Sequence, residues 1–257
     1  MRNMSLRGLM LVLLLASAAV LVQACQQSEP AEGPEASAQK EPKGAEQPVE
    51  PAKAAGDGDL EPIDIILPLP RFPGTPEAIR FGTKVEKPRG EPRPPFPAPK
   101  GTTNVALKKP VVGSSVPFNV ELKVITDGNK EAEGYVELGP DRQHVQIDLG
   151  AEHNIYAIVI WHYHQQPRVY HDVVVRVSSD QDFITDVKTV FNNDYDNSAG
   201  LGVGEELEWI ETNEGRLIDT KGVKGRYVRL YSNGNTTDDL NHYVEVEVYG
   251  KPAPGSA

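Results

Sequence analysis

The sequence predicts an all-β fold, an antiparallel β-sandwich of about eight strands. Apolar and polar residues alternate with a period of two in three segments, as in strands with one buried face, namely 145–149, 228–230 and 244–248. Turn-forming pairs such as Asp127-Gly128 separate segments of this kind. No helical period persists long enough to compete with the strand pattern.

The segment 154–180 lies at the centre of the predicted sheet. Its first part, 155–161, is apolar on both alternating faces, and its second part, 172–177, is a run of valines broken by Arg176. β-Branched and aromatic residues at this density, over segments shorter than typical helices, predict two buried strands. The connector 162–171 holds three histidines, an arginine, two tyrosines and a proline. Rigid sheets commonly carry binding groups on loops at their ends, so the connector is the predicted functional surface.

Length and composition limit the number of folded domains. The chain has 257 residues with 22 prolines, most of which precede Lys100. Only the C-terminal part can therefore bury a sizeable core. The formal net charge of −11 argues against nucleic acid and against anionic lipid surfaces as partners. Cys25 is the only cysteine, so an internal disulfide is excluded.

Residues 1–25 have the features of an export signal that ends in a cysteine. Two arginines precede a continuous apolar run at 9–22, which is too short to span a bilayer and matches a signal-peptide core in length. Val22-Gln23-Ala24-Cys25 resembles the lipobox of bacterial lipoproteins. The resemblance implies that Cys25 is lipidated, that residues 1–24 are removed, and that Gln26 directs the protein to the outer membrane. The alternative is an unmodified thiol behind an ordinary signal peptide.

Two segments of different character follow the signal. Residues 25–59 contain almost no large apolar side chains, which predicts a disordered, solvated Ala/Pro/Glu tether. Residues 60–101 carry apolar side chains among repeated prolines, which predicts an extended arm. The arm is either packed along the following domain or a stiff spacer without contacts. A flexible tail is predicted at 252–257.

Six short segments of the C-terminal part occur in a recognisable order and spacing. They are Asn104-Val105-Ala106-Leu107 with Lys109-Pro110, Thr126-Asp127-Gly128-Asn129, 145–150, 175–180, 226–230 and 245–250. Together they resemble discoidin domains, also called coagulation-factor type C (F5/8 type C) domains, of the galactose-binding-like kind. The resemblance spans 102–251 and implies a jelly-roll β-sandwich. Its members include carbohydrate-binding modules of family 32 and fucose-binding lectins, but the scaffold also binds phospholipid or protein.

The resemblance also implies a structural calcium site. Many members hold Ca²⁺ between the Asp-Gly-Asn loop and an acidic residue of the last strand, and Asp127, Asn129 and Glu245 stand at those places. The backbone carbonyl oxygens of Val124 and Val244 would complete the oxygen shell that calcium needs. The alternative is a plain Asp-Gly turn with Glu245 as an exposed strand residue.

The connector carries the ligand prediction. Arg168 matches an arginine of the fucose-binding lectins, whereas Trp161 stands where they have a second arginine, so fucose itself is not implied. The predicted ligand-binding residues offer hydrogen bonds or stacking rings; they are His162, Tyr163, His164, Arg168, Tyr170, His171 and Tyr195. An acidic polysaccharide would suit this basic, aromatic set. The alternative is that Arg168 pairs with a carboxylate such as Asp172 and that the histidines are ordinary surface residues.

Two further patterns concern metals. His162, His164 and His171 have a spacing that suits Zn²⁺ or Cu²⁺, but neither a cysteine nor an evident carboxylate ligand accompanies them. The acidic loop around Asp194 and Asp196 resembles part of an EF-hand loop without its flanking helices, and it predicts a solvated turn.

The predicted function is that of a membrane-anchored lipoprotein that displays a non-catalytic carbohydrate-binding module at the cell envelope. The alternative is a protein–protein interaction or scaffold module of the envelope, with 60–101 as part of its interface. No GxSxG, HExxH or Cys-His pattern is present, so the sequence does not predict an enzyme.

Overall fold

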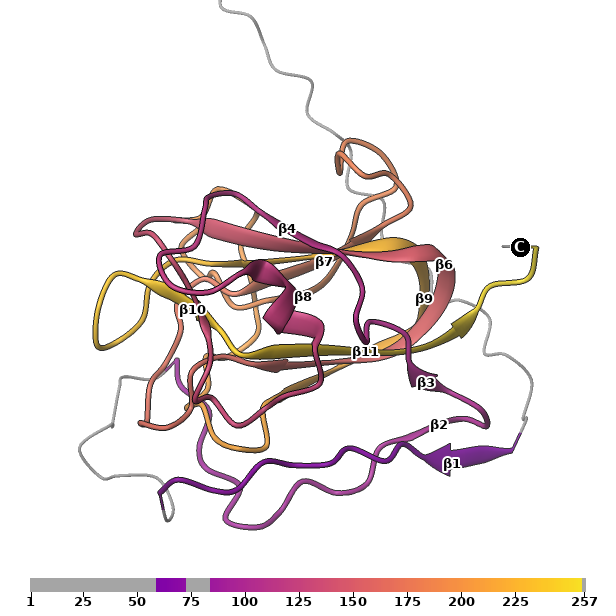
Figure 1. Cartoon of the computed structure of the whole chain (residues 1–257), viewed down its shortest axis with the longest axis horizontal. Helices are drawn as coiled ribbons and strands as arrows, with labels where there is room; N and C mark the ends of the chain where they lie inside the picture. Colours follow the sequence, from indigo (N-terminus) through magenta and orange to yellow (C-terminus); the bar gives the residue numbers. More distant parts are fainter. Residues whose placement is uncertain (1–58, 73–83, 256–257) are drawn as a thin grey trace, which may run out of the picture. The chain divides into compact units, whose positions relative to one another are not determined.

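Residues 59–72 and 84–255 are described by the computed structural model (Figure 1). By its contacts the chain divides into Met1–Glu46 and Gln47–Ala257, and all described residues belong to the second unit. The predicted signal peptide, Cys25 and the predicted tether as far as residue 58 lie outside them. No helix in the described part of the chain is long and apolar enough to cross a membrane.

The described residues are built from strands, which confirms the all-β prediction. The only helix among them is the 3₁₀ helix η1 (Leu122–Thr126). The strands in chain order are β1 (Leu60–Pro62), β2 (Pro97–Pro99), β3 (Thr103–Asn104), β4 (Val111–Gly113), β5 (Val136–Leu138), β6 (Gln143–Trp161), β7 (Val174–Ser178), β8 (Lys188–Asn192), β9 (Arg216–Ser232), β10 (Asn241–Tyr243) and β11 (Glu245–Pro252).

The main sheet has the order β3-β11-β6-β9-β7-β8, with β4 also paired to β6 and every pairing antiparallel. The pairing of its two long strands, β6 and β9, has two register shifts. The register of β6 shifts between Asp148 and His153, around Gly150, whose φ of 85° suits glycine. A second register shift, between Ile155 and Ala157 of β6, faces Lys221 and Gly222 of β9, which also have positive φ. The sequence pattern suggested two strands at 145–149 and 155–161, but they form one continuous bent strand.

The bends fold the sheet into the two layers of a sandwich (Figure 1). One layer holds β4, β7, β8 and one half of the β6–β9 pair, and the other holds β3, β11 and the other half. Ile147 and Val228 of the first layer and Ile158 and Val246 of the second belong to one buried core. Burial of such side chains supplies the main drive for folding.

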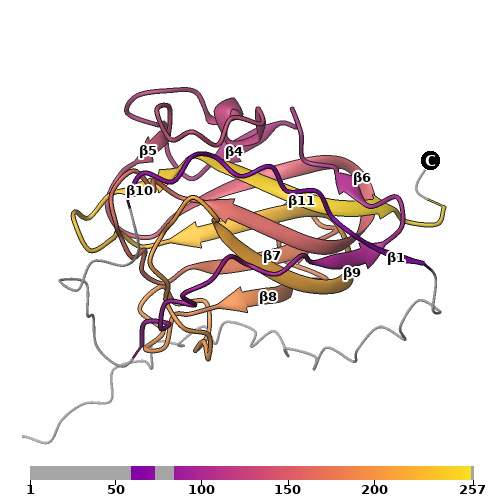
Figure 2. The same cartoon turned by 90° about the horizontal axis from the view of Figure 1, so that it is seen from below.

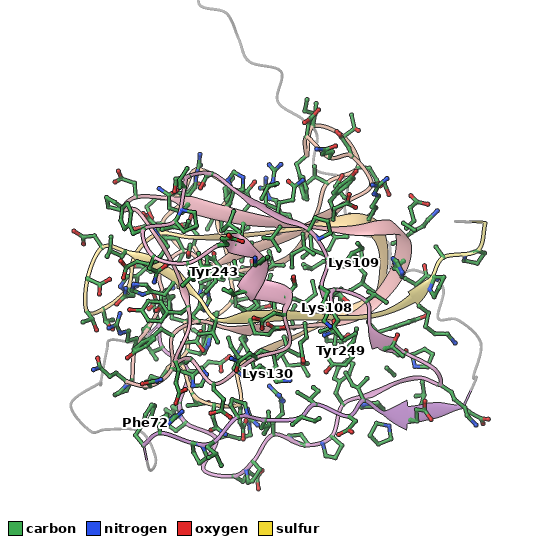
Figure 3. The ribbon with its side chains drawn as sticks, viewed as in Figure 1. Phe72, Lys108, Lys109, Lys130, Tyr243 and Tyr249 are labelled. Atoms are coloured by element: carbon green, nitrogen blue, oxygen red, sulfur yellow. The ribbon has the colours of Figure 1, made fainter. Side chains whose placement is uncertain are left out.

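The arm packs on the outer face of the second layer. Ile63, Ile65 and Phe96 contact a second buried cluster that includes Trp161 and Tyr249. β1 pairs with β2, and the Ile63 amide donates to the Phe96 carbonyl at 3.0 Å. Figures 1 and 2 show the arm along this face from two directions, and Figure 3 shows Tyr249 beside it. The stiff-spacer alternative is therefore wrong for the described part of the arm.

This packing explains the double-faced apolar pattern of 155–161. Ile158 and Ile160 face the core between the layers, whereas Ala157, Val159 and Trp161 face the arm. At the other end of the chain, β11 continues to Pro252 and Ala253 is buried, so the body extends into the predicted tail.

Candidate functional site

One end of the sandwich, called the rim below, is built from the connector 162–171, the loop 233–240, β5 and β10. Main-chain hydrogen bonds join the first two, with the Thr236 amide donating to Val169 at 3.0 Å and the Asn233 amide donating to His171 at 2.9 Å. β10 pairs with β5, which places His242 opposite Glu137. The connector is thus held by chain segments that are distant in sequence.

The first histidines of the connector point into the interior. His162 is fully buried, its Nδ1 lies 2.5 Å from Glu211 Oε1, and its ring stacks on Tyr170 at 4.3 Å. His164 is also fully buried, with Nε2 2.8 Å from the Lys130 carbonyl. A carbonyl only accepts, so the proton of His164 lies on Nε2. Neither imidazole lies on the surface, contrary to expectation.

The buried part of the rim centres on His242, which the sequence analysis did not single out. Its Nδ1 accepts from Arg168 Nη1 at 3.3 Å and pairs with the Tyr170 hydroxyl at 2.9 Å. Because a guanidinium only donates, the His242 proton lies on Nε2, 3.3 Å from Glu137 Oε2. Burial lowers the pKa of His242 to about 4, so the imidazole is neutral near pH 7. Burial also raises the pKa of Tyr170, whose phenol stays protonated.

Arg168 does pair with a carboxylate, but its partner is Asp238. Arg168 Nη1 lies 3.1 Å from Asp238 Oδ2, and the guanidinium carbon lies 4.7 Å from the centre of the Tyr163 ring. Asp172, the partner suggested by the sequence, instead accepts hydrogen bonds from Ser198 and Asn233. The Arg168 side chain is 12% exposed, so it is largely held in place before any ligand arrives.

The accessible part of the rim is small and mixed in character. Tyr135 and Tyr163 are half-buried, with ring centres 4.8 Å apart, beside the partly exposed carboxylates of Glu137 and Asp238. Because Asp238 compensates Arg168 and the nearby His242 is neutral, the rim is not the basic surface that an acidic polysaccharide would need. No local sequence signal marked Glu137 or Asp238, since they reach the rim through distant segments.

His171 and Tyr195 make separate contacts. His171 Nδ1 lies 2.7 Å from Glu208 Oε1, and this hydrogen bond raises the pKa of His171. Tyr195 is exposed, with Lys84 Nζ 5.1 Å from its ring centre. The three connector histidines therefore have three different partners and do not form one cluster for a transition metal among the described residues.

The acidic loop is more enclosed than a solvated turn. Asp172, Asp194 and Asp196 are the one group of His, Cys, Asp or Glu side chains in 59–72 and 84–255 whose ligand atoms are close enough for one ion. Asp194 is fully buried and accepts the amides of Ser198 and Ala199 at 2.9 and 3.0 Å. These bonds define a turn cap.

Two of the residues implied for calcium, Asp127 and Glu245, lie near each other in space. The Gly128 amide lies 3.2 Å from both oxygens of Glu245, which is fully buried rather than exposed. Burial, followed by the charges of Glu247 and Asp127, raises the pKa of Glu245 to about 9. A buried carboxylate beside a second acid is stabilised by a cation, and oxygen ligands suit Ca²⁺. The carboxyl groups of Asp127 and Glu245 therefore fit the ion chemically, whereas the side-chain oxygen of Asn129 accepts the Glu131 amide at 3.1 Å.

The sequence matches no protein-family model and no curated protein. Solved structures similar to it include the CBM32 module of AlyQ in complex with 4,5-unsaturated mannuronic acid, at 19% identity over 54% of this chain and 92% of that one, with a TM-score of 0.41. A chitosan-binding module from a Paenibacillus chitosanase/glucanase has 20% identity over 58% and 99% of the two chains and a TM-score of 0.41. A fucose-binding module of Streptococcus pneumoniae has 19% identity over 57% and 97%, with a TM-score of 0.42. Similarity at these levels of identity concerns the fold alone.

Proposed function

We propose that this protein is a non-catalytic carbohydrate-binding module that holds a glycan at the rim. The observation that carries the proposal is the arrangement around Arg168, a guanidinium held between Asp238 and the Tyr163 ring at the end of a rigid sandwich. Binding sites commonly combine apolar rings with a few fixed polar groups. The similar modules named for mannuronic acid, chitosan and fucose support the class of ligand.

The rim offers complementary chemistry to a sugar ring. Glu137 and Asp238 accept hydrogen bonds from hydroxyl groups, and the N–H groups of Arg168 donate to hydroxyl or ring oxygens. Tyr135 and Tyr163 offer ring edges and faces to the apolar C–H surface of a sugar. Since Asp238 offsets the Arg168 charge, a neutral glycan suits the rim better than an acidic one.

Replacing Arg168 by alanine should weaken glycan binding about tenfold or more, because a charge-assisted hydrogen bond and the support of Tyr163 are both lost. The measurement is a glycan array followed by calorimetric titration of the hits. Arg226→Ala is the matched control, since Arg226 forms an ion pair with Asp148 at the bend of β9 and is no part of the rim. A folded wild type that binds no glycan, or equal losses in both variants, would contradict the proposal.

We further propose that the module is lipid-anchored at Cys25 and displayed at the outer membrane. The support is the sequence Val22-Gln23-Ala24-Cys25 behind a charged, apolar leader. In a bacterial host fed labelled palmitate, the wild type is expected to carry label and to sediment with outer membranes. Cys25→Ser should lose both properties. An unlabelled, soluble wild type would refute the anchor while leaving the rim proposal intact.

A further inference from the structure

A groove of about 860 Å³ lies between the arm and the segment that leads into β9. Its walls are the arm residues 70–72 and 86–93 and most of 209–217. Phe72, which lines it, is labelled in Figure 3 near the end of the first described stretch of the arm. The volume falls within the range of small-ligand sites, about 300–1,000 Å³. None of the rim residues lines this groove, so it is a separate candidate site.

The lining of the groove is cationic in a protein of net charge −11. Its five cationic and three acidic side chains are Arg71, Lys87, Arg89, Arg93, Arg216, Glu86, Glu91 and Glu214. Three of the cations are already engaged. Arg216 pairs with Glu86 at 2.7 Å and Arg89 with Glu214 at 3.4 Å, and Arg71 pairs with Glu131 and Glu133, which lie outside the lining, at 3.2 and 3.3 Å. Lys87 has no ion-pair partner in the part of the chain that the structure describes. The unpaired ammonium group of Lys87 in a concave site attracts an anion.

Two buried donors of the groove residues also lack acceptors. Trp209 Nε1 and Arg216 Nε are buried, and neither has a hydrogen-bond partner among the described residues. Trp209 is 7% exposed. The guanidinium carbon of Arg216 lies 5.3 Å from the ring centre of Trp209 and 5.2 Å from the ring centre of Phe191. Both groups only donate, so a ligand that satisfies them must bring acceptor oxygens.

We propose that this groove is a second binding site, which takes an oligosaccharide bearing carboxylate groups. The carboxylates would pair with Lys87 and Arg89, and hydroxyl or ring oxygens would accept from the Trp209 and Arg216 N–H groups. The apolar faces of sugar rings would pack on Phe72 and on the prolines of the lining. Binding in the groove does not depend on the rim, so failure of one of the two proposals would leave the other intact.

An acidic peptide is the less suitable ligand because the nearby main chain is already paired. The Glu86 amide donates to Glu208 at 2.8 Å, and the Glu208 amide donates to Lys84 at 3.0 Å. A peptide that adds to a sheet edge needs such groups unpaired.

The test is calorimetric titration of the whole protein with tetragalacturonate, with its methyl ester, and with tetraglutamate. The double variant Lys87→Gln, Arg89→Gln should bind tetragalacturonate about tenfold or more weakly than the wild type, since two charge-assisted contacts are lost. Lys123→Gln, Lys224→Gln removes the same charge from exposed sites outside the groove and should bind like the wild type. Arg168→Ala should also bind it like the wild type.

The methyl ester, whose carboxylates are masked, is expected not to bind. Absence of tetragalacturonate binding by the wild type, equal binding of the ester, or an equal loss in the Lys123/Lys224 control would overturn the proposal. Tetraglutamate binding as tightly as the sugar would overturn the saccharide assignment. Loss of binding in Arg168→Ala would move the site to the rim.

Discussion

Deletion of residues 59–100 is expected to remove about 5 kcal/mol or more of the free energy of unfolding. The deletion exposes Val159, Trp161, Leu217 and Tyr249, and each large apolar side chain loses about 1.5–3 kcal/mol when it leaves a buried site. Because whole domains are stable by only about 5–15 kcal/mol, the shortened sandwich should be largely unfolded or lose its cooperative transition. Thermal and urea unfolding, followed by near-ultraviolet circular dichroism, would measure the change.

Point variants test whether the arm stabilises the sandwich through the side chains that pack on its outer face. Ile63→Ala with Phe96→Ala removes two half-buried contacts with the outer face and should cost about 2 kcal/mol. Ile66→Ala with Leu69→Ala is the matched control, because these arm side chains are 73% and 69% exposed and their loss should leave the melting temperature unchanged. Equal melting temperatures for the two double variants would show that the arm does not stabilise the sandwich.

Calcium is expected to raise the melting temperature by about 5–10 °C, and EDTA to reverse the change. A ligand present at about 100 times its dissociation constant stabilises the folded state by about 2.7 kcal/mol, and each kcal/mol shifts the melting temperature by about 2–4 °C in a domain of this size. The physical reason is the buried Glu245 carboxylate, which has the charge of Asp127 nearby. Differential scanning calorimetry with calcium and with EDTA gives the measurement.

Two variants locate the ion. Glu245→Gln keeps the shape and the contact with Gly128 but cannot supply an anionic oxygen to the ion, so its melting temperature should no longer respond to calcium. Asp194→Asn is the control, because Asp194 is also a buried carboxylate and belongs to the competing acidic cluster. Its response should match the wild type. A response lost in Asp194→Asn but kept in Glu245→Gln would put the ion in the acidic loop.

The local sequence pattern was enough for the strands. Alternation in 228–230 and 244–248 is a property of neighbouring residues. The first segment lies near the end of β9, and 245–248 of the second form the start of β11. The apolar character of 155–161 on both faces also showed that both faces are covered. The pattern did not show which segment covers the outer face. The covering residues, such as Ile63 and Phe96, come from the arm, and the prolines of the arm are equally typical of a spacer without contacts.

The candidate sites needed the tertiary structure. The connector's residue types predicted a binding surface, but His162 is buried against Glu211 and Arg168 is paired with Asp238, 49 and 70 positions away in the chain. The groove joins arm residues to 209–217, and neither segment has a motif of its own. The alternation of side chains along a strand depends on local backbone geometry and can therefore be predicted from the sequence. The partner of a polar side chain depends on which distant segments the fold brings together, and only the packed chain decides that.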